Sequence, residues 1–170
     1  KDLRIMAYNR AVKDLNNLPE REFIAKISEK FTVKEVSSND KDGGYVPGTK
    51  KEFGMYMSGK WFSVTIKPQY YSDDPILSLS VSILQNNILE PLLGIKDPRT
   101  DKRIDFIGGI KGTAYLKSLV DKGEYAVVFS MFPTTMEELF KVSDAGKLMP
   151  PKSTWFEPKL LSGITLHKLD

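Results

Sequence analysis

Apolar residues recur along the first fifty positions at spacings that change from strand-like to helical and back. Leu3 to Ala7 is a short apolar run of the kind found in buried strands. Phe23 and Ile27 repeat at helical spacing among charged residues, just after Pro19, which suits a first helical turn. In order, the pattern predicts a strand over 3–7, a helix over 19–30, a strand over 32–36 and a long mobile loop over 37–51.

The clearest β signal follows, where two alternating arms flank a two-residue turn. Residues 52–57 and 60–67 alternate apolar and polar positions on either side of Ser58-Gly59. Two-residue loops containing glycine are the commonest connections of β-hairpins. The segment therefore predicts an antiparallel hairpin in the middle of the chain.

The second half alternates predicted helices with predicted strands. Residues 77–81 alternate as a strand would, but a longer helical spacing favours a helix with Ser80 as its N-cap. A capping box, Thr134-x-x-Glu137, opens a later helix that is expected to bury Met136, Leu139 and Phe140. The other predicted elements are a strand over 103–107, a helix over 113–123, a strand over 125–131 and a last strand over 162–168.

Together these elements predict an α+β (mixed α/β) fold. We expect a single mixed, largely antiparallel sheet with a central hairpin and about four packed helices, because hairpins require antiparallel pairing and strand-helix-strand units permit parallel pairing. The chain has 170 residues and no evident linker, so one domain over 1–170 is expected.

Composition excludes several classes of activity. With no cysteine and one histidine, His167, the chain has no thiolate nucleophile and no paired-histidine or zinc-ribbon site, so no metal site is predicted. A Ser-His-Asp triad would have to use His167, which alternates with apolar residues as a surface strand residue does. The net charge of +3 comes from scattered basic residues, which argues against nucleic-acid binding. No apolar run approaches the ~18 residues of a membrane span, and no signal peptide is visible, so we expect a cytoplasmic protein without a membrane partner.

A glycine-rich turn between a predicted strand and a predicted helix is the first candidate ligand element. Gly108, Gly109 and Lys111 precede Thr113, which gathers backbone N–H groups, an ammonium and a hydroxyl at a helix start. This arrangement is typical of an anion site, although the segment matches neither common nucleotide-loop motif. The alternative is a tight turn without a ligand.

The proline-rich segment 147–159 is the second candidate element. Its three prolines stiffen the backbone beside groups that suit phosphate, two ammonium ions and two hydroxyls. These groups belong to Lys152, Lys159, Ser153 and Thr154. The alternative is a rigid clasp in which Trp155 and Phe156 cover the edge of the core.

Charged and polar residues near two other strands complete the candidate set. Asn9 and Arg10 end the first predicted strand, where Arg10 is expected either to clamp a carboxylate or phosphate or to pair with a structural acid. Arg103 and Asp105 project from one side of their strand together with Asp101. We favour a self-neutralising exterior for these three, with paired-carboxylate catalysis as the alternative.

Several of these segments, taken in order, resemble a known family. The chain is similar to the C-terminal part of a bacterial and archaeal family named only as domain of unknown function number 1015. The resemblance is carried by Ala7–Leu15, Gly54–Tyr56, Ile88–Ile95, Arg103–Gly109 and Met149–Lys159. Ser80 stands where the family pattern has an aspartate, so the resemblance implies no acidic role there.

The resemblance implies a longer parent protein, of which this chain is the C-terminal module. The upstream half of the family carries an Asp-Gly-His-His-Arg segment similar to the phosphate-binding element of ParB and sulfiredoxin-like proteins. That segment does not occur in this sequence. The implied partner is therefore the N-terminal half of the same parent. The family has no assigned activity, so enzyme class, cofactor and oligomeric state stay open.

Two hypotheses about function follow. In the first, the chain contributes basic and hydroxyl residues to a site for a phosphate-bearing small molecule or nucleotide, completed by the missing half. In the second, it is a non-catalytic scaffolding or protein-interaction domain that uses its hairpin and aromatic clasp. The first requires distant cations to meet in one hollow. The cations in question are Arg10, Lys111, Lys152 and Lys159.

Overall fold

The computed structural model describes residues 2–158, so Lys159, His167 and the predicted strand over 162–168 lie outside the described residues. Within that part of the chain, one antiparallel sheet has the strand order β3-β5-β4-β7-β2-β6. Its strands are β2 (Tyr8–Val12), β3 (Phe31–Val36), β4 (Glu52–Met57), β5 (Lys60–Ile66), β6 (Ile104–Gly108) and β7 (Val127–Ser130). Parallel pairing, which the sequence permitted, is not used between these strands.

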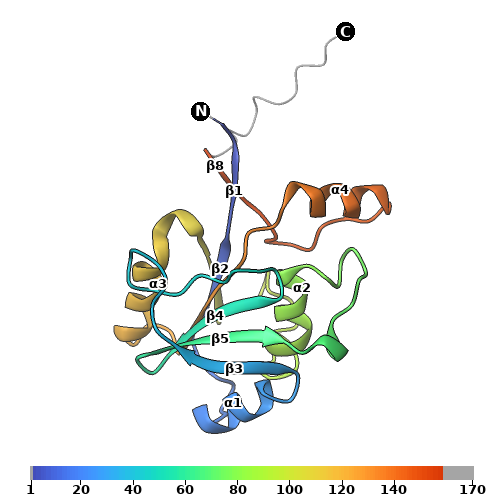
Figure 1. Ribbon diagram of the computed structural model, residues 1–170. Helices are drawn as coiled ribbons and strands as arrows, with labels where there is room; N and C mark the ends of the chain where they lie inside the picture. The colour runs from blue at the N-terminus through green and yellow to red at the C-terminus, as the bar shows by residue number, and fades with distance from the viewer. Residues whose placement is uncertain (1, 159–170) are drawn as a thin grey trace.

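A second, two-stranded sheet joins the two ends of the described chain. β1 (Arg4–Met6) pairs antiparallel with β8 (Trp155–Glu157). Figure 1 shows this ribbon extending beyond the end of β2, with α4 to one side and α1 at the opposite end of the molecule. Because β1 leads directly into β2, the ribbon keeps the proline-rich segment close to the strand that carries Arg10.

β4 and β5 form the predicted hairpin, and its turn explains why. Ser58 (φ 50°) and Gly59 (φ 79°) both adopt left-handed conformations, which give a two-residue turn the twist that the flanking strands need. The hairpin lies between β3 and β7 rather than at an edge, and its Phe53 and Met55 are fully buried. Its apolar face is therefore part of the core and is not available as an interaction surface.

Four α-helices pack around the sheet in the described residues, as predicted in outline. They are α1 (Glu20–Ile27), α2 (Ser80–Leu84), α3 (Gly112–Asp121) and α4 (Met136–Asp144). A π-helical turn, η2 (Gln85–Leu89), continues α2, and short 3-10 turns occupy η1 (Pro68–Tyr70) and η3 (Gly109–Lys111). Ser80 is not an N-cap as predicted, because its hydroxyl donates to the carbonyl of Lys50 at 2.5 Å. The α+β class is confirmed.

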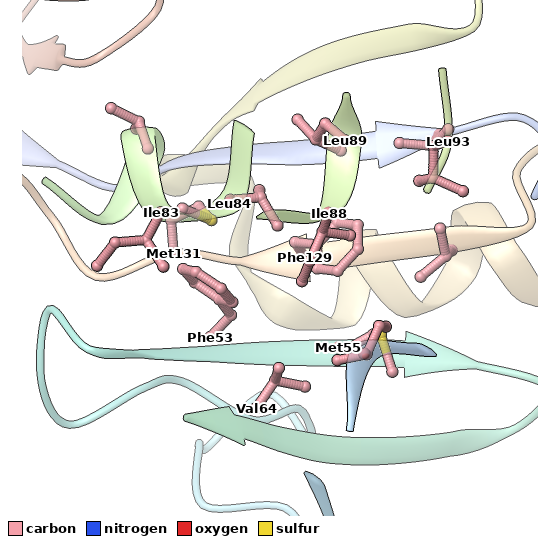
Figure 2. Packing of buried hydrophobic residues seen from close by; sticks show 14 of the residues in the cluster. Phe53, Met55, Val64, Ile83, Leu84, Ile88, Leu89, Leu93, Phe129 and Met131 are labelled. Atoms are coloured by element: carbon pink, nitrogen blue, oxygen red, sulfur yellow. The ribbon is translucent and has the colours of Figure 1, made fainter. Parts of the chain in front are cut away.

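The larger core lies between one face of the sheet and the α2–η2 segment. Figure 2 shows apolar side chains from that segment facing strand residues across the gap between the layers. The helical partners are Ile83, Leu84, Ile88 and Leu89, and the strand partners are Phe53, Met55, Val64 and Phe129. Helix α1 adds Phe23 and Ile27 to the same core near β3.

The opposite face of the sheet carries α3. Leu116 and Leu119 of this helix pack against Ala11, Tyr56 and Val128 of the central strands. Because side chains alternate across a strand, β2 presents Ala11 to α3 and Val12 to the α2–η2 side. The central strands are therefore covered by helices on both faces.

Helix α4 differs from its prediction by one residue at the cap and by its buried face. The capping box consists of Thr135 and Glu138, whose side chains each bond the other residue's backbone N–H. Met136 and Phe140, expected in the core, are 51% and 60% exposed, whereas Val142 is buried. Leu139 is partly buried, so α4 turns the face that carries Leu139 and Val142 toward the body, and the face of Met136 and Phe140 lies outside.

The segment 37–51 is packed against the body, although it was predicted as a mobile loop. Asn39 and Val46 exchange two hydrogen bonds, and the Ser130 hydroxyl donates to the carbonyl of Tyr45 at 2.6 Å. Gly44 lies so close to α3 that a Cβ there would stand 2.2 Å from the Cβ of Thr113. The glycines that suggested mobility allow close backbone approach instead.

Candidate functional site

The polar residues Tyr8, Asn9 and Arg10 belong to a central strand and do not end the first strand as predicted. β2 pairs with β6 on one side and β7 on the other, and Arg10 faces Phe106 and Phe129 in the two registers. The apolar run that predicted a strand at 3–7 is the start of a longer extended segment. Arg10 therefore comes from the middle of the sheet.

Arg10 is a buried cation without an acidic partner in the described chain. Its side chain is only 4% exposed. One terminal nitrogen of its guanidinium donates to the carbonyl of Tyr8, and the other donates to the carbonyl of Lys152 at 2.7 Å. No carboxylate among residues 2–158 forms an ion pair with it. A guanidinium has five N–H donors, so these two bonds leave it able to bind a further acceptor.

Two aromatic rings bring Lys152 to the same place. The Arg10 Cζ lies 5.0 Å from the ring centre of Phe106 and 5.8 Å from that of Tyr8. The Lys152 Nζ lies 5.5 Å and 5.9 Å from the same two rings. Aromatic faces attract cations at these distances, and the shared platform holds two positive charges together. The structure thus joins a strand residue to a loop residue 142 positions away.

Burial lowers the pKa of Arg10 from its ordinary value to about 9, and a smaller electrostatic effect of Tyr8 raises it. Removing a charged group from water disfavours its charged form, and an ion pair would have offset that cost. Because none does so in residues 2–158, a bound anion would stabilise the guanidinium. A buried arginine with a lowered pKa and no acidic partner is more typical of a ligand-binding site than of a structural ion pair.

Arg10 lies in the wall of a cavity of about 560 Å³ on the α2–η2 side of the sheet. Its apolar lining comes from Ile76, Val81 and Phe106 and from prolines 150 and 151. Polar and charged groups line the remainder. They are Ser82, Gln85, Asn86, Glu90, Lys96, Asp97 and Arg99. Arg99 pairs with Asp97 at 3.1 Å, and Lys96 is exposed.

The other residues of the proline-rich segment have structural contacts. Ser153 is buried, its hydroxyl donates to the carbonyl of Pro150, and its own carbonyl accepts from the Thr134 hydroxyl at 2.8 Å. Thr154 is partly buried. Lys152 has a left-handed backbone conformation (φ 59°), which together with these bonds fixes the turn. The proline-rich segment therefore serves mainly to position Lys152, and its Ser153 hydroxyl is already used in a bond within the segment.

The glycine-rich turn lies on the α3 side, away from the Arg10 cavity. Gly109 lines a second cavity, and the Lys111 ammonium lies 5.7 Å from the ring of Tyr115. The Thr113 hydroxyl donates to Asp40 at 2.7 Å, so a carboxylate of this chain already lies at the start of α3. Gly108 instead touches the clasp, since a Cβ there would stand 2.5 Å from the Trp155 ring. Anion binding at this turn stays a prediction.

Arg103 and Asp105 do not line the Arg10 cavity, and each contacts partners elsewhere. Arg103 pairs with Asp101 at 3.0 Å and with Asp14 at 3.4 Å, and these contacts match the self-neutralising exterior. Asp105 accepts a hydrogen bond from the Tyr125 hydroxyl, and this bond raises the pKa of Tyr125 to about 12. Of the predicted cations, the structure brings Arg10 and Lys152 together and leaves Lys111 on the other side.

Sequence reasoning missed the residues that complete this cavity. Phe106 and Tyr8 were assigned to strands, but their role as a platform depends on the β2–β6 register. Gln85, Asn86 and Arg99 gave no signal, because their spacing matches no motif. The one sequence feature that could have indicated a site was an aromatic residue, Phe106, beside charged residues in a predicted strand.

Two classes of site are absent from the part of the chain that the structure describes. No group of three or more His, Cys, Asp or Glu side chains is placed to hold a metal ion in residues 2–158. None of the helices described there is long and apolar enough to cross a membrane.

Comparisons with known proteins give a family resemblance and a similar fold. Residues 1–84 match the family described as "Protein of unknown function (DUF1015)". No curated protein matches the chain. A mutant of a free serine kinase, solved in complex with AMP, has a TM-score of 0.53 and 18% identity, over 92% of this chain and 55% of that one. A conserved hypothetical protein from Pyrococcus furiosus has a TM-score of 0.52 and 16% identity, over 91% and 56%.

The structural likeness covers almost all of this chain but little more than half of the two proteins it matches. At such low identity the likeness establishes the fold and leaves the site to be argued from the chain's own residues. Through residues 1–84, the chain is similar to the DUF1015 family.

Proposed function

We propose that this chain is a ligand-binding module whose Arg10 cavity takes a phosphate-bearing small molecule, with a nucleotide as the first candidate. The observation that carries the proposal is the buried guanidinium of Arg10, which has donors to spare and no acidic partner in the described residues. Arginine binds phosphate through paired N–H groups, and lysine adds a point charge. Lys152 supplies that second charge on the shared aromatic platform.

The rest of the cavity suits a ligand with a polar end and a flat apolar part. Its volume of about 560 Å³ is in the range of small-molecule sites, roughly 300–1,000 Å³. Phe106 and Ile76 offer apolar surface, while Asn86 and Gln85 offer amide donors and acceptors. The serine kinase of similar fold was solved with AMP, which supports a nucleotide as the first probe.

We further propose that the site is completed by the N-terminal half of a longer parent protein. The chain spans 55% of the serine kinase and 56% of the Pyrococcus furiosus protein, so both have a large part without a counterpart here. Prolines 150 and 151 line the Arg10 cavity. A second module bound over the cavity would add ligand contacts and would exclude water from the buried cation.

The test is a thermal-shift and calorimetric titration of the chain with AMP, ADP and inorganic pyrophosphate, repeated on the intact parent. A ligand at about 100 times its Kd stabilises the folded state by about 2.7 kcal/mol, which gives a clear shift in Tm. We expect measurable stabilisation of the chain and a larger one of the parent. The absence of stabilisation in both proteins would overturn the proposal.

Matched variants locate the binding. Lys152→Ala removes an exposed ammonium and should weaken binding about tenfold, which corresponds to about 1.4 kcal/mol. Lys111→Ala removes an exposed ammonium that also lies near one aromatic ring, on the α3 side, and should leave binding unchanged. Arg10→Lys keeps a buried charge without the paired donors and should weaken binding further. Equal effects of the Lys152 and Lys111 variants would place the ligand elsewhere.

A protein-interaction module is the second candidate, and exposed apolar side chains favour it. Met136 and Phe140 on α4 are 51% and 60% exposed, and Leu3 of the chain start is 51% exposed. Exposed clusters of this kind mark interaction surfaces. Light scattering over a range of concentrations would test self-association, with Phe140→Ser as the variant that should abolish it. A monomer at every concentration, with no binding of the parent's other half, would remove this candidate.

A further inference from the structure

A second cavity, of about 620 Å³, opens on the α3 side of the sheet. Its walls combine the β1–β2 segment, the start of α3, the end of β7 and the loop 37–51. Much of the lining is apolar, including Met6, Val46 and Phe132. Because β2 alternates, Asn9 faces this cavity while Arg10 faces the first one.

The acidic side of this cavity is held in place by hydrogen bonds and close packing. Asp40 accepts from the Thr113 hydroxyl at 2.7 Å through one carboxylate oxygen. Asp42 lies close to the helix start, since a Cβ on Gly112 would stand 2.7 Å from its Oδ2. The packing of Gly44 against Thr113 keeps the loop that carries both acids against α3.

Neither carboxylate is neutralised by the described chain. Asp40 and Asp42 form no ion pair with any residue from 2 to 158. Two cations, Arg4 and Lys41, also line the cavity, but both are exposed and neither pairs with Asp40 or Asp42. Two carboxylates at one cavity favour a cationic ligand, because each gains from an ammonium within hydrogen-bond distance.

Asn9 provides an independent sign of a ligand. It is only 4% exposed, and its Oδ1 accepts the backbone N–H of Met131 at 2.8 Å. This bond fixes the orientation of the amide, so that Nδ2 is the free end. No acceptor in residues 2–158 bonds that Nδ2, although Asn9 lines the cavity. In residues 2–158 the fully enclosed side-chain atoms without a partner are Trp61 Nε1 and Glu138 Oε2, so Asn9 Nδ2 is not enclosed, and its donors are available to an acceptor in the cavity.

We propose that this cavity binds a small organic amine that carries a hydrogen-bond acceptor near its ammonium group. The ammonium lies against Asp40 and Asp42, the acceptor takes the Nδ2 donors of Asn9, and any apolar part packs against Phe132 and Val46. The proposal is independent of the phosphate site, because the two cavities lie on opposite faces of the sheet.

Paired probes test the charge requirement. The chain is titrated with glycinamide and with acetamide, and with ethanolamine and with ethylene glycol, while backbone amide shifts are followed by NMR. We expect the amines to shift the signals of Asn9, Gly112 and Thr113, and each uncharged partner to bind at least about tenfold more weakly. Equal binding of an amine and its uncharged partner would overturn the proposal.

Variants test the residues. Asp42→Asn changes an exposed side chain without a partner and should weaken glycinamide binding about tenfold. Asn9→Asp keeps an acceptor for the Met131 N–H and removes the Nδ2 donors, while its added negative charge favours both amines alike. The ratio of glycinamide affinity to ethanolamine affinity should therefore fall, because ethanolamine offers a weaker acceptor and loses less. Asp73→Asn, an exposed acid outside this cavity, is the control and should leave both affinities unchanged. An unchanged affinity in Asp42→Asn would contradict the proposal even if Asn9→Asp failed to fold.

Discussion

Gly108 shows how the absence of a side chain shapes the first site. It is buried at the end of β6, opposite Tyr8, and the indole of Trp155 packs directly on its backbone. The Trp155 ring also meets the Tyr8 ring edge to face at 5.3 Å. The platform under the two cations therefore depends on a position where only hydrogen fits.

We predict that Gly108→Ala displaces Trp155 and destabilises the chain by about 1–3 kcal/mol, the usual cost of overpacking. The new Cβ would stand 2.5 Å from the rigid indole, closer than real contacts allow. Urea unfolding measures the stability, and tryptophan fluorescence reports the ring. Gly48→Ala is the matched control, because nothing lies within 4 Å of its Cβ position, and it should change neither. An unaltered fluorescence spectrum in Gly108→Ala would refute the packing described for Trp155.

At the scale of elements, α4 depends on its capping box. Thr135 accepts from the Glu138 N–H at 3.1 Å, and Glu138 accepts from the Thr135 N–H at 3.1 Å. We predict that Thr135→Ala lowers the free energy of unfolding by about 1 kcal/mol, whereas Thr135→Ser, which keeps the oxygen, changes it little. Thermal unfolding of the three proteins provides the measurement. Equal losses in both variants would assign the effect to the threonine methyl group instead of the cap.

The elements that were predicted well are those whose signal is local. The hairpin at 52–66 follows from alternation and the Ser58-Gly59 turn, and α1 follows from Phe23 and Ile27 at helical spacing. β2 was missed because Asn9 and Arg10 interrupt its apolar pattern, and both are polar because they face cavities. When polar residues on both faces of a strand line cavities, the alternation of apolar and polar residues that predicts a strand is lost.

The site itself was only half predictable. Arg10 and Lys152 were singled out from residue type, but their meeting depends on the pairing of β1 with β8, which joins segments about 150 residues apart. Phe106 enters through a strand register, and Arg99 through a loop, and neither contact has a local sequence signal. Long-range contacts of this kind follow from topology.

At the scale of the whole molecule, the lowered pKa of Arg10 links proton binding to ligand binding. Burial lowers the pKa of Arg10 to about 9 in the folded chain, well below the pKa of an arginine in the unfolded chain. Above pH 9 the unfolded state therefore binds more protons, so the cost of burying Arg10 is relieved as the pH rises. A phosphate ligand favours the charged guanidinium of Arg10, so its binding at this pH is coupled to uptake of a proton by Arg10.

We predict that binding of pyrophosphate near pH 9 is accompanied by uptake of a fraction of a proton at Arg10, and that binding near pH 7 involves none at this residue. Calorimetry in two buffers of different ionisation enthalpy measures the uptake. Above pH 9 the affinity should fall, because the guanidinium is then increasingly neutral. Arg10→Met is the comparison, and the same uptake in that variant would show that another group titrates.

Because side chains alternate along β2, the single layer of the sheet separates the two cavities. Asn9 and Arg10 are consecutive, yet each reaches a different side. Shifting the register of β2 by one residue would move Arg10 to the α3 side and Asn9 to the α2–η2 side, and it would move Ala11 and Val12 out of their cores at the same time. The register that packs these two apolar residues therefore also decides which cavity receives the cation.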